Sequence, residues 1–238
     1  MSAAIRLIGA VVDRGGQRIV HGVDLAVQSG AWFGLIGANG SGKTSLLRAL
    51  AGRLPFAGGT CSILGQDVAS DRVVRAACFG FAPPADKLPD SLRGRDILAL
   101  VGGTVEAALP KVGAVGDALG VRALLDRWIG DCSAGMRQRL AIAAAFAGGH
   151  DQVILDEPFN WLDPVAAFDL RHALRQRVDA GLTLLTALHD LTTLAVACDA
   201  GLMLAEGKVA MTLEEGILRD AARDPHAFER YTIDRLRA

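Results

Sequence analysis

Eight consecutive residues carry the clearest chemical signal in the sequence. The phosphate-binding pattern of a glycine, four residues, then Gly-Lys-Thr is met by Gly37-Ala38-Asn39-Gly40-Ser41-Gly42-Lys43-Thr44. In such a loop several backbone N–H groups point at one spot, where a polyphosphate fits. Lys43 would then reach the terminal phosphates, and the Thr44 hydroxyl would hold Mg²⁺. The residues that we expect to bind the nucleotide here are Gly37, Asn39, Gly40, Ser41, Gly42, Lys43, Thr44 and Ser45.

The segments on either side of this loop have the character that a phosphate site needs. Residues 31–36 read as a short apolar strand, and residues 45–51 have the apolar spacing of a helix that Gly52 closes. The alternative, a glycine turn that binds nothing, does not explain this strand–loop–helix context. The sequence therefore predicts a nucleotide site.

A second chemical signal is a pair of acids at the end of another apolar strand. The strand at 153–155 runs into Asp156 and Glu157, and strand ends are where folds of this kind present groups to a ligand. Asp156 would ligate Mg²⁺, through water, from the side opposite Thr44. Glu157 would orient and deprotonate the attacking water. The alternative is a pair of acids that cap a strand before a proline turn.

The elements that must position these residues alternate between strand and helix. Strands are predicted at 5–12, 19–27, 61–64, 78–81, 152–155 and 183–188 and in a hairpin at 201–212. Helices are predicted at 164–180 and 191–198. The first two strands form an antiparallel pair around a glycine turn, and the later apolar strands favour a doubly wound α/β core.

The middle of the chain differs from this core. Helical segments at 96–101, 105–109 and 115–128 follow Pro83 and Pro84, and strand signals are absent there. We therefore predict one domain over residues 1–238. Its core covers about 1–83 and 149–212, an inserted helical subdomain covers about 84–148, and an amphipathic helical tail covers 213–238.

Composition narrows the possible partners. The 238 residues carry a formal net charge of −1, so no overall field attracts nucleic acid, and no nucleic-acid partner is expected. The chain is 51% hydrophobic, but it has no run of 18 apolar residues and its first six residues lack the apolar core of a signal peptide. The four cysteines have no metal or redox spacing. These features suggest a cytosolic protein whose membrane association would come through a partner.

Five motifs in order make the chain resemble the ATP-binding subunits of ABC transporters over roughly residues 4–212. The phosphate loop is similar to the Walker A motif, and Asp156 and Glu157 to the Walker B aspartate and catalytic glutamate. Residues 132–140 resemble the signature, residues 160–163 the D-loop, and His189 the switch histidine. The resemblance implies an α/β fold with a P-loop NTPase core (RecA-like, with a mostly parallel sheet), an antiparallel β subdomain and an inserted helical subdomain.

The resemblance also implies a mechanism. Two such subunits, identical or different, would pack head to tail around two ATP molecules. Each ATP would be held by Lys43 of one subunit and by Ser133 and Gly135 of the other, with His189 at the γ-phosphate. ATP binding would close the pair and hydrolysis would reopen it. The pair would drive a separate transmembrane permease from the cytoplasmic face of the cell membrane. The Gly-Met-Arg-Gln-Arg run at 135–139 favours export.

Several positions depart from the family pattern, including Cys132, Ala134 and Met136, which replace Leu, Gly and Gln in the signature. Arg14 stands where many members stack an aromatic residue on adenine, although an arginine can also stack through its guanidinium plane. Pro84 stands where the family has a glutamine that contacts Mg²⁺ and the attacking water. Trp161 is a bulky residue for a D-loop. Two alternatives therefore stay open: a soluble ABC ATPase without a permease, and a regulatory ABC subunit that hydrolyses ATP poorly.

Overall fold

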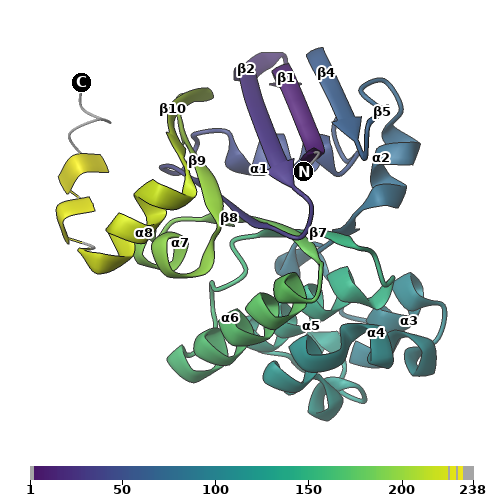
Figure 1. Ribbon diagram of the computed structural model, residues 1–238. Helices are drawn as coiled ribbons and strands as arrows, with labels where there is room; N and C mark the ends of the chain where they lie inside the picture. The colour runs from purple at the N-terminus through teal and green to yellow at the C-terminus, as the bar shows by residue number, and fades with distance from the viewer. Residues whose placement is uncertain (1–2, 225, 229, 233–238) are drawn as a thin grey trace.

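The chain folds around two β-sheets. The computed structural model describes residues 3–224, 226–228 and 230–232. Within them, a four-stranded antiparallel sheet has the order β2-β1-β4-β5. Its strands are β1 (Ala3–Arg14), β2 (Gln17–Gln28), β4 (Gly58–Ile63) and β5 (Gln66–Asp67). Figure 1 shows this sheet at the top of the molecule, at one end of the fold.

The second sheet is mostly parallel and has the order β10-β9-β3-β8-β7-β6. Its strands are β3 (Trp32–Ile36), β6 (Gly80–Phe81), β7 (Gln152–Asp156), β8 (Thr183–Leu188), β9 (Ala200–Ala205) and β10 (Lys208–Leu213). Only the β9–β10 pairing among them is antiparallel. The prediction of a mostly parallel sheet with an antiparallel subdomain is confirmed.

Strand β3 shows why these strands are almost continuously apolar. All five of its residues are buried. Phe33 and Leu35 belong to the core between the two sheets, whereas Trp32 and Ile36 belong to the core on the opposite face. Because successive side chains of a strand point to opposite faces, a strand covered on both faces needs apolar residues at every position.

Helix α1 (Lys43–Leu50) fills the space between the sheets. Its Leu46, Leu47 and Leu50 are fully buried in the same core as Phe33 and Leu35. The helix ends at Ala51, and Gly52 follows in the left-handed conformation. The apolar face of α1 therefore fixes the helix that begins at the phosphate loop.

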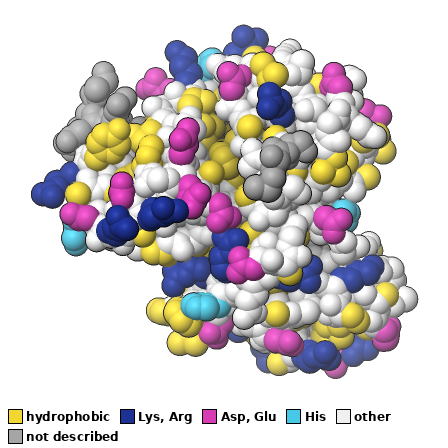
Figure 2. All heavy atoms as spheres, in the orientation of Figure 1, with side chains coloured by type: hydrophobic (Ala, Val, Ile, Leu, Met, Phe, Trp, Pro, Cys, Tyr) yellow, Lys and Arg dark blue, Asp and Glu magenta, His cyan; other side chains and the backbone are white. Residues whose placement is uncertain are grey.

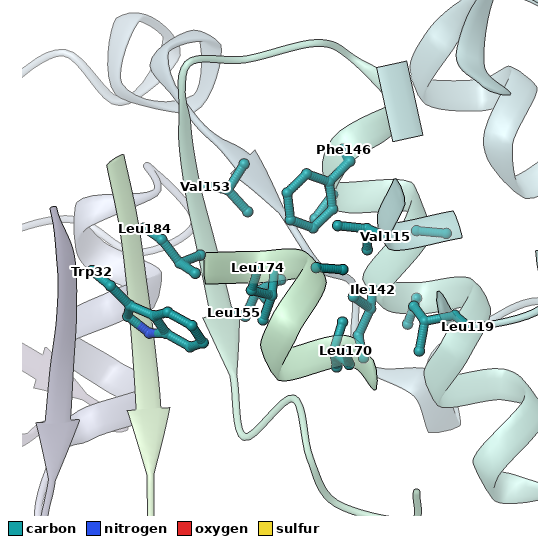
Figure 3. Packing of buried hydrophobic residues seen from close by; sticks show 14 of the residues in the cluster. Trp32, Val115, Leu119, Ile142, Phe146, Val153, Leu155, Leu170, Leu174 and Leu184 are labelled. Atoms are coloured by element: carbon teal, nitrogen blue, oxygen red, sulfur yellow. The ribbon is translucent and has the colours of Figure 1, made fainter. Parts of the chain in front are cut away.

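Four helices cover the other face of the parallel sheet: α3 (Gly94–Gly102), α4 (Val105–Ala118), α5 (Ala134–Ala147) and α6 (Pro164–Asp179). Figure 3 shows Ile142 and Phe146 of α5 and Leu170 and Leu174 of α6 packed together beside Leu155 of β7. Every residue of α5 from Leu140 onward is buried. The helical subdomain and the sheet thus share one core.

A buried arginine connects α1 to the antiparallel subdomain. Arg75 lies on α2 (Arg72–Cys78) and is 0% exposed. Its guanidinium donates hydrogen bonds only to backbone carbonyls: those of Ala49 (3.0 Å), Val68 (2.7 Å), Leu54 (3.3 Å) and Ala69. This side chain therefore satisfies four carbonyl groups at the junction of several segments.

Two predicted elements are wrong. A strand was expected at 78–81, but α2 occupies residues up to Cys78 and only Gly80 and Phe81 form a strand. Asp71 caps α2 by accepting hydrogen bonds from the N–H groups of Val73 and Val74, both 3.0 Å. No element was predicted at residues 72–77, where this cap starts a helix.

The helix predicted at 115–128 ends early. Helix α4 stops at Ala118, and Gly120 has a left-handed φ of 60° before a 3₁₀ turn at Val121–Leu124. Val121 and Leu124 are nevertheless buried. The apolar residues of this turn face the core, so their spacing resembles that of a longer helix.

The remaining elements follow the prediction. In the chain, helix α7 (Leu191–Ala197) follows β8 and precedes β9, and α8 (Glu215–Arg223) begins the tail. Residues 226–228 and 230–232 are also helical. The rest of the predicted tail helix lies outside the described residues, and the domain boundaries stay predictions.

The surface carries mixed charge. Figure 2 shows basic and acidic side chains interspersed over one face. Among the described residues, no single helix is both long and apolar enough to cross a bilayer. The pair α3 and α4 has that length and composition only together, and it is bent by 99° at its junction.

Candidate functional site

Glycines shape the loop between β3 and α1. Gly37 has a φ of 153°, and a Cβ there would lie 2.2 Å from the Leu204 carbonyl oxygen. Gly40 and Gly42 have φ values of 82° and 103°, which residues with a side chain rarely adopt. Gly42 is also the N-cap of α1. The loop therefore needs glycine at these positions, and it ends at the positive end of a helix.

The β9–β10 hairpin braces this loop from outside. The Gly207 N–H donates to the Ser41 carbonyl (3.1 Å), and the His21 N–H donates to the Gly207 carbonyl (2.8 Å). The sequence predicted the hairpin turn but not this contact, since nothing in a hairpin signal indicates what its turn touches.

Two polar groups in the loop are buried and ready for an anion. The Ser41 hydroxyl is buried without a hydrogen-bond partner among the described residues. Lys43 is 4% exposed, and its Nζ donates to the carbonyls of Gly37 (2.6 Å) and Ala38 (3.2 Å). Burial lowers the pKa of Lys43, while the charges of Glu157 and Asp156 oppose that shift. An unpaired hydroxyl and a buried ammonium in a glycine loop fit the oxygens of a polyphosphate.

The next residue meets the end of β7. The Thr44 hydroxyl donates to Asp156 Oδ1 at 3.1 Å. Burial raises the pKa of Asp156, and the Thr44 hydrogen bond opposes this shift. A hydroxyl and a carboxylate this close are the oxygen donors that Mg²⁺ takes, so the two side chains could hold the metal.

Glu157 has an unusual backbone that several contacts hold in place. Its φ is +50°, which is uncommon for a residue with a side chain. Its N–H donates to the Ala187 carbonyl (3.1 Å). Gln138 of α5 donates from Nε2 to the carbonyls of Glu157 and Pro158, both 3.3 Å. Asn160 Nδ2 donates to Glu157 Oε2 at 2.6 Å. The motif analysis did not anticipate these roles of Gln138 and Asn160.

A cleft of about 390 Å³ opens beside these groups. Thr44, Asp156 and Glu157 line the cleft, and so does the segment 81–86, which includes Pro84. A neighbouring hollow of about 320 Å³ contains the phosphate loop, Glu157 and Arg14. The structure thus brings together most of the predicted site residues, and it places Pro84 and Arg14 beside them.

His189 follows β8 and lines a further hollow together with Glu157 and Asn160. The expected histidine is therefore adjacent to the expected base.

The signature residues lie elsewhere. Ser133 is the N-cap of α5, and its Oγ accepts from the Met136 N–H at 3.3 Å. Ser133 and Gly135 line neither the cleft nor the hollow that contain the phosphate loop. A Cβ on Gly135 would lie 2.6 Å from the Trp161 carbonyl oxygen. The structure therefore does not bring Ser133 and Gly135 to the phosphate loop of the same chain, whereas Gln138 of the same motif lines the cleft.

The fold and the loop geometry define a P-loop nucleotide-binding protein. The family described as "ABC transporter" matches residues 20–160. Nod factor export ATP-binding protein I of Rhizobium meliloti is 31% identical over 226 residues, which cover 91% of this chain and 68% of that protein. The daunorubicin/doxorubicin resistance ATP-binding protein DrrA of Streptomyces peucetius is 32% identical over 229 residues, covering 91% and 69%.

Solved structures agree on the fold. The structure titled "ATP binding subunit of ABC transporter" has a TM-score of 0.82 at 24% identity and covers 97% of this chain and 98% of that one. A bacterial Atm1-family ABC exporter with ATP bound has a TM-score of 0.79 at 22% identity, covering 98% of this chain and 42% of the exporter. The chain belongs to the ABC transporter family and is an ATP-binding subunit, an ATPase of a transporter complex with membrane subunits.

Removing the buried ammonium tests the phosphate site. We expect Lys43→Met, which keeps the apolar stem, to weaken ATP binding by about 10- to 100-fold, the worth of a charge-assisted hydrogen bond. Calorimetric titration of ATP measures this. The exposed Lys208→Met is the control, and an unchanged dissociation constant for Lys43→Met would contradict the assignment.

Neutralising Asp156 separates its function from stability. Burial raises the pKa of the Asp156 carboxyl in the folded protein. The free energy of unfolding therefore decreases as the pH rises from the unfolded pKa through the folded pKa, because the buried group must then carry a charge. We expect Asp156→Asn to raise the Tm of the nucleotide-free protein by a few degrees near neutral pH. The gain should shrink as the pH falls toward the unfolded value of about 3.9. Scanning calorimetry of Asp156→Asn measures this difference in Tm, with the exposed Asp169→Asn as the control. A lower Tm of Asp156→Asn than of the wild type at neutral pH would contradict the prediction.

Proposed function

We propose that this subunit hydrolyses ATP with Glu157 as the general base. The observation that supports this most strongly is the convergence of Lys43, Thr44, Asp156 and Glu157 around connected hollows, with the Thr44 hydroxyl 3.1 Å from Asp156. Lys43 would leave its loop carbonyls for the terminal phosphates, and the glycine-loop N–H groups would hold the β- and γ-phosphates.

In the reaction a water oxygen bonds to the γ-phosphorus, the bond from that phosphorus to the bridging oxygen breaks, and Glu157 accepts the proton of the water. Thr44 and Asp156 would hold Mg²⁺, which when bound neutralises charge on the phosphate oxygens. His189 lies in the hollow beside Glu157 and would contact the γ-phosphate.

The position of the signature supports a two-subunit site. Ser133 and Gly135 lie at the start of α5, away from the phosphate loop of the same chain. In a head-to-tail pair, with an identical or a related chain, they would reach the ATP held by the other subunit. ATP would thereby join the two subunits, and its hydrolysis would release them.

We further propose that the pair energises export by a separate transmembrane permease, at the cytoplasmic face of the cell membrane. The support is that two similar proteins are a Nod factor export ATP-binding protein and a daunorubicin/doxorubicin resistance ATP-binding protein. Affinity capture of the tagged chain from detergent-solubilised membranes of its host tests this. A near-stoichiometric polytopic membrane protein is expected. Recovery with ribosomes or DNA, or alone in the soluble fraction, would favour a permease-free ATPase instead.

Pro84 favours a second candidate, a subunit that binds ATP but hydrolyses it poorly. It lines the cleft beside Glu157, and its side chain has no donor or acceptor. The ATPase rate of the wild type, compared with that of Glu157→Gln, separates the two candidates: a much faster wild type supports the hydrolysing subunit, and equal rates support the poorly hydrolysing one.

A further inference from the structure

The contacts of Glu157 with Asn160 carry an inference that rests on the proposed function. We propose that Asn160 is a positioning residue for the reaction: its amide orients the Glu157 carboxylate and the attacking water, in a cleft where residue 84 is a proline and offers no amide side chain.

The hydrogen bond between these side chains has a defined direction. Asn160 Nδ2 lies 2.6 Å from Glu157 Oε2. An ionised carboxylate only accepts hydrogen bonds, so the amide NH₂ must face it and the amide oxygen must point elsewhere. Oε1 of Glu157 thus remains available to a water molecule, and the Asn160 oxygen remains available as a second acceptor.

The backbone holds Asn160 in this position. The Asn160 N–H donates to the Glu157 carbonyl at 3.3 Å, so the two residues close one turn. Gln138 donates to the same carbonyl from the opposite element, α5. The amide and the carboxylate therefore belong to one unit that is fixed on both sides.

The surroundings place this unit where the chemistry occurs. Asn160 lines the cleft with Thr44, Asp156 and Glu157, and it also lines the hollow that contains His189. The charged groups around Glu157 come from α1 (Lys43) and β7 (Asp156). Neither can donate a neutral hydrogen bond to its carboxylate, whereas Asn160 does so without changing the net charge.

The experiment compares variants of the purified full chain. Asn160→Ala should lower kcat for ATP by about 10- to 100-fold, as expected for the loss of a hydrogen bond to a charged group, while KM and Tm change little. Asn160→Asp keeps the shape but replaces the donor with a second carboxylate, so it should be at least as slow. Removal of an exposed amide far from the cleft, Gln66→Ala, is the matched control and should retain the wild-type kcat.

Rescue distinguishes positioning from a structural role. Pro84→Gln introduces an amide at another residue that lines the cleft, and in the Asn160→Ala background it should recover a several-fold part of kcat. Glu157→Gln combined with Asn160→Ala should be no slower than Glu157→Gln alone, because residues that act as one unit are not additive.

The outcomes separate this inference from the proposed function. Wild-type turnover well above that of Glu157→Gln, together with full kcat in Asn160→Ala, would overturn the role of Asn160 and leave the proposed base intact. A fall in Tm that accompanies the loss of kcat, without rescue by Pro84→Gln, would also overturn it. Wild type no faster than Glu157→Gln would overturn both.

Discussion

Glu157→Gln should lower the ATPase rate by about 10²- to 10⁴-fold, the usual worth of a general base. The substitution keeps the size of the side chain and an oxygen that can accept from Asn160, and it removes the negative charge together with the ability to take a proton. ATP binding should survive because the phosphate loop is unchanged. The measurement is phosphate release at saturating ATP beside a separate titration of ATP affinity.

The same variant should also change the assembly. ATP that is bound but not hydrolysed should trap two subunits around it, so light scattering should report a dimer in ATP and a monomer without it. Lys43→Met is the control that should stay monomeric. If the wild type were as slow as Glu157→Gln, the chain would instead be the poorly hydrolysing subunit that Pro84 suggests.

Arg75→Met should be the most destabilising of these substitutions, by about 3–5 kcal/mol, because it removes four hydrogen bonds of a fully buried guanidinium and leaves the Leu54 and Ala69 carbonyls without this donor. Methionine replaces most of the apolar stem, so the loss would come from the guanidinium rather than from a cavity. In a chain of this size the Tm should fall by about 10 °C. Denaturant unfolding followed by circular dichroism measures the free energy directly.

Arg72→Met is the matched control on the same helix. Arg72 also donates to backbone carbonyls, those of Gly52 (3.1 Å) and Arg53 (3.2 Å), but it is exposed. Water can replace its hydrogen bonds, so its loss should cost less than about 1 kcal/mol. Equal stabilities of Arg75→Met and the wild type would show that the buried guanidinium contributes nothing net.

Much of the fold follows from the sequence because its signals are local. The phosphate loop is defined by glycine spacing, and Gly37 has no room for a Cβ. The strand at 183–188 coincides with β8 because a strand buried on both faces is apolar at every position. Asp163 and Pro164 mark the start of α6 as a cap and a first-turn proline.

The missed features depend on contacts between distant segments. No element was predicted at residues 72–77, but Asp71 starts a helix there and buried Arg75 holds it against carbonyls 6 to 26 positions away. Gln138 lies 19 residues from Glu157, and no spacing rule predicts that its amide supports the turn that carries the Glu157 carboxylate. Motif order could locate Glu157 but not the groups that orient it.

Two tryptophans, Trp32 and Trp161, differ in exposure and can serve as intrinsic fluorescent probes. Trp32 is fully buried, with its indole N–H donating to Thr186 at 2.9 Å, whereas Trp161 is 74% exposed and lines the cleft that contains Glu157. Trp32 should emit at short wavelength and resist iodide quenching, while Trp161 should emit at long wavelength and be quenched. When a second subunit or another protein covers the cleft, the emission of Trp161 should therefore shift to shorter wavelength and its quenching by iodide should decrease. Binding can then be followed without any added label.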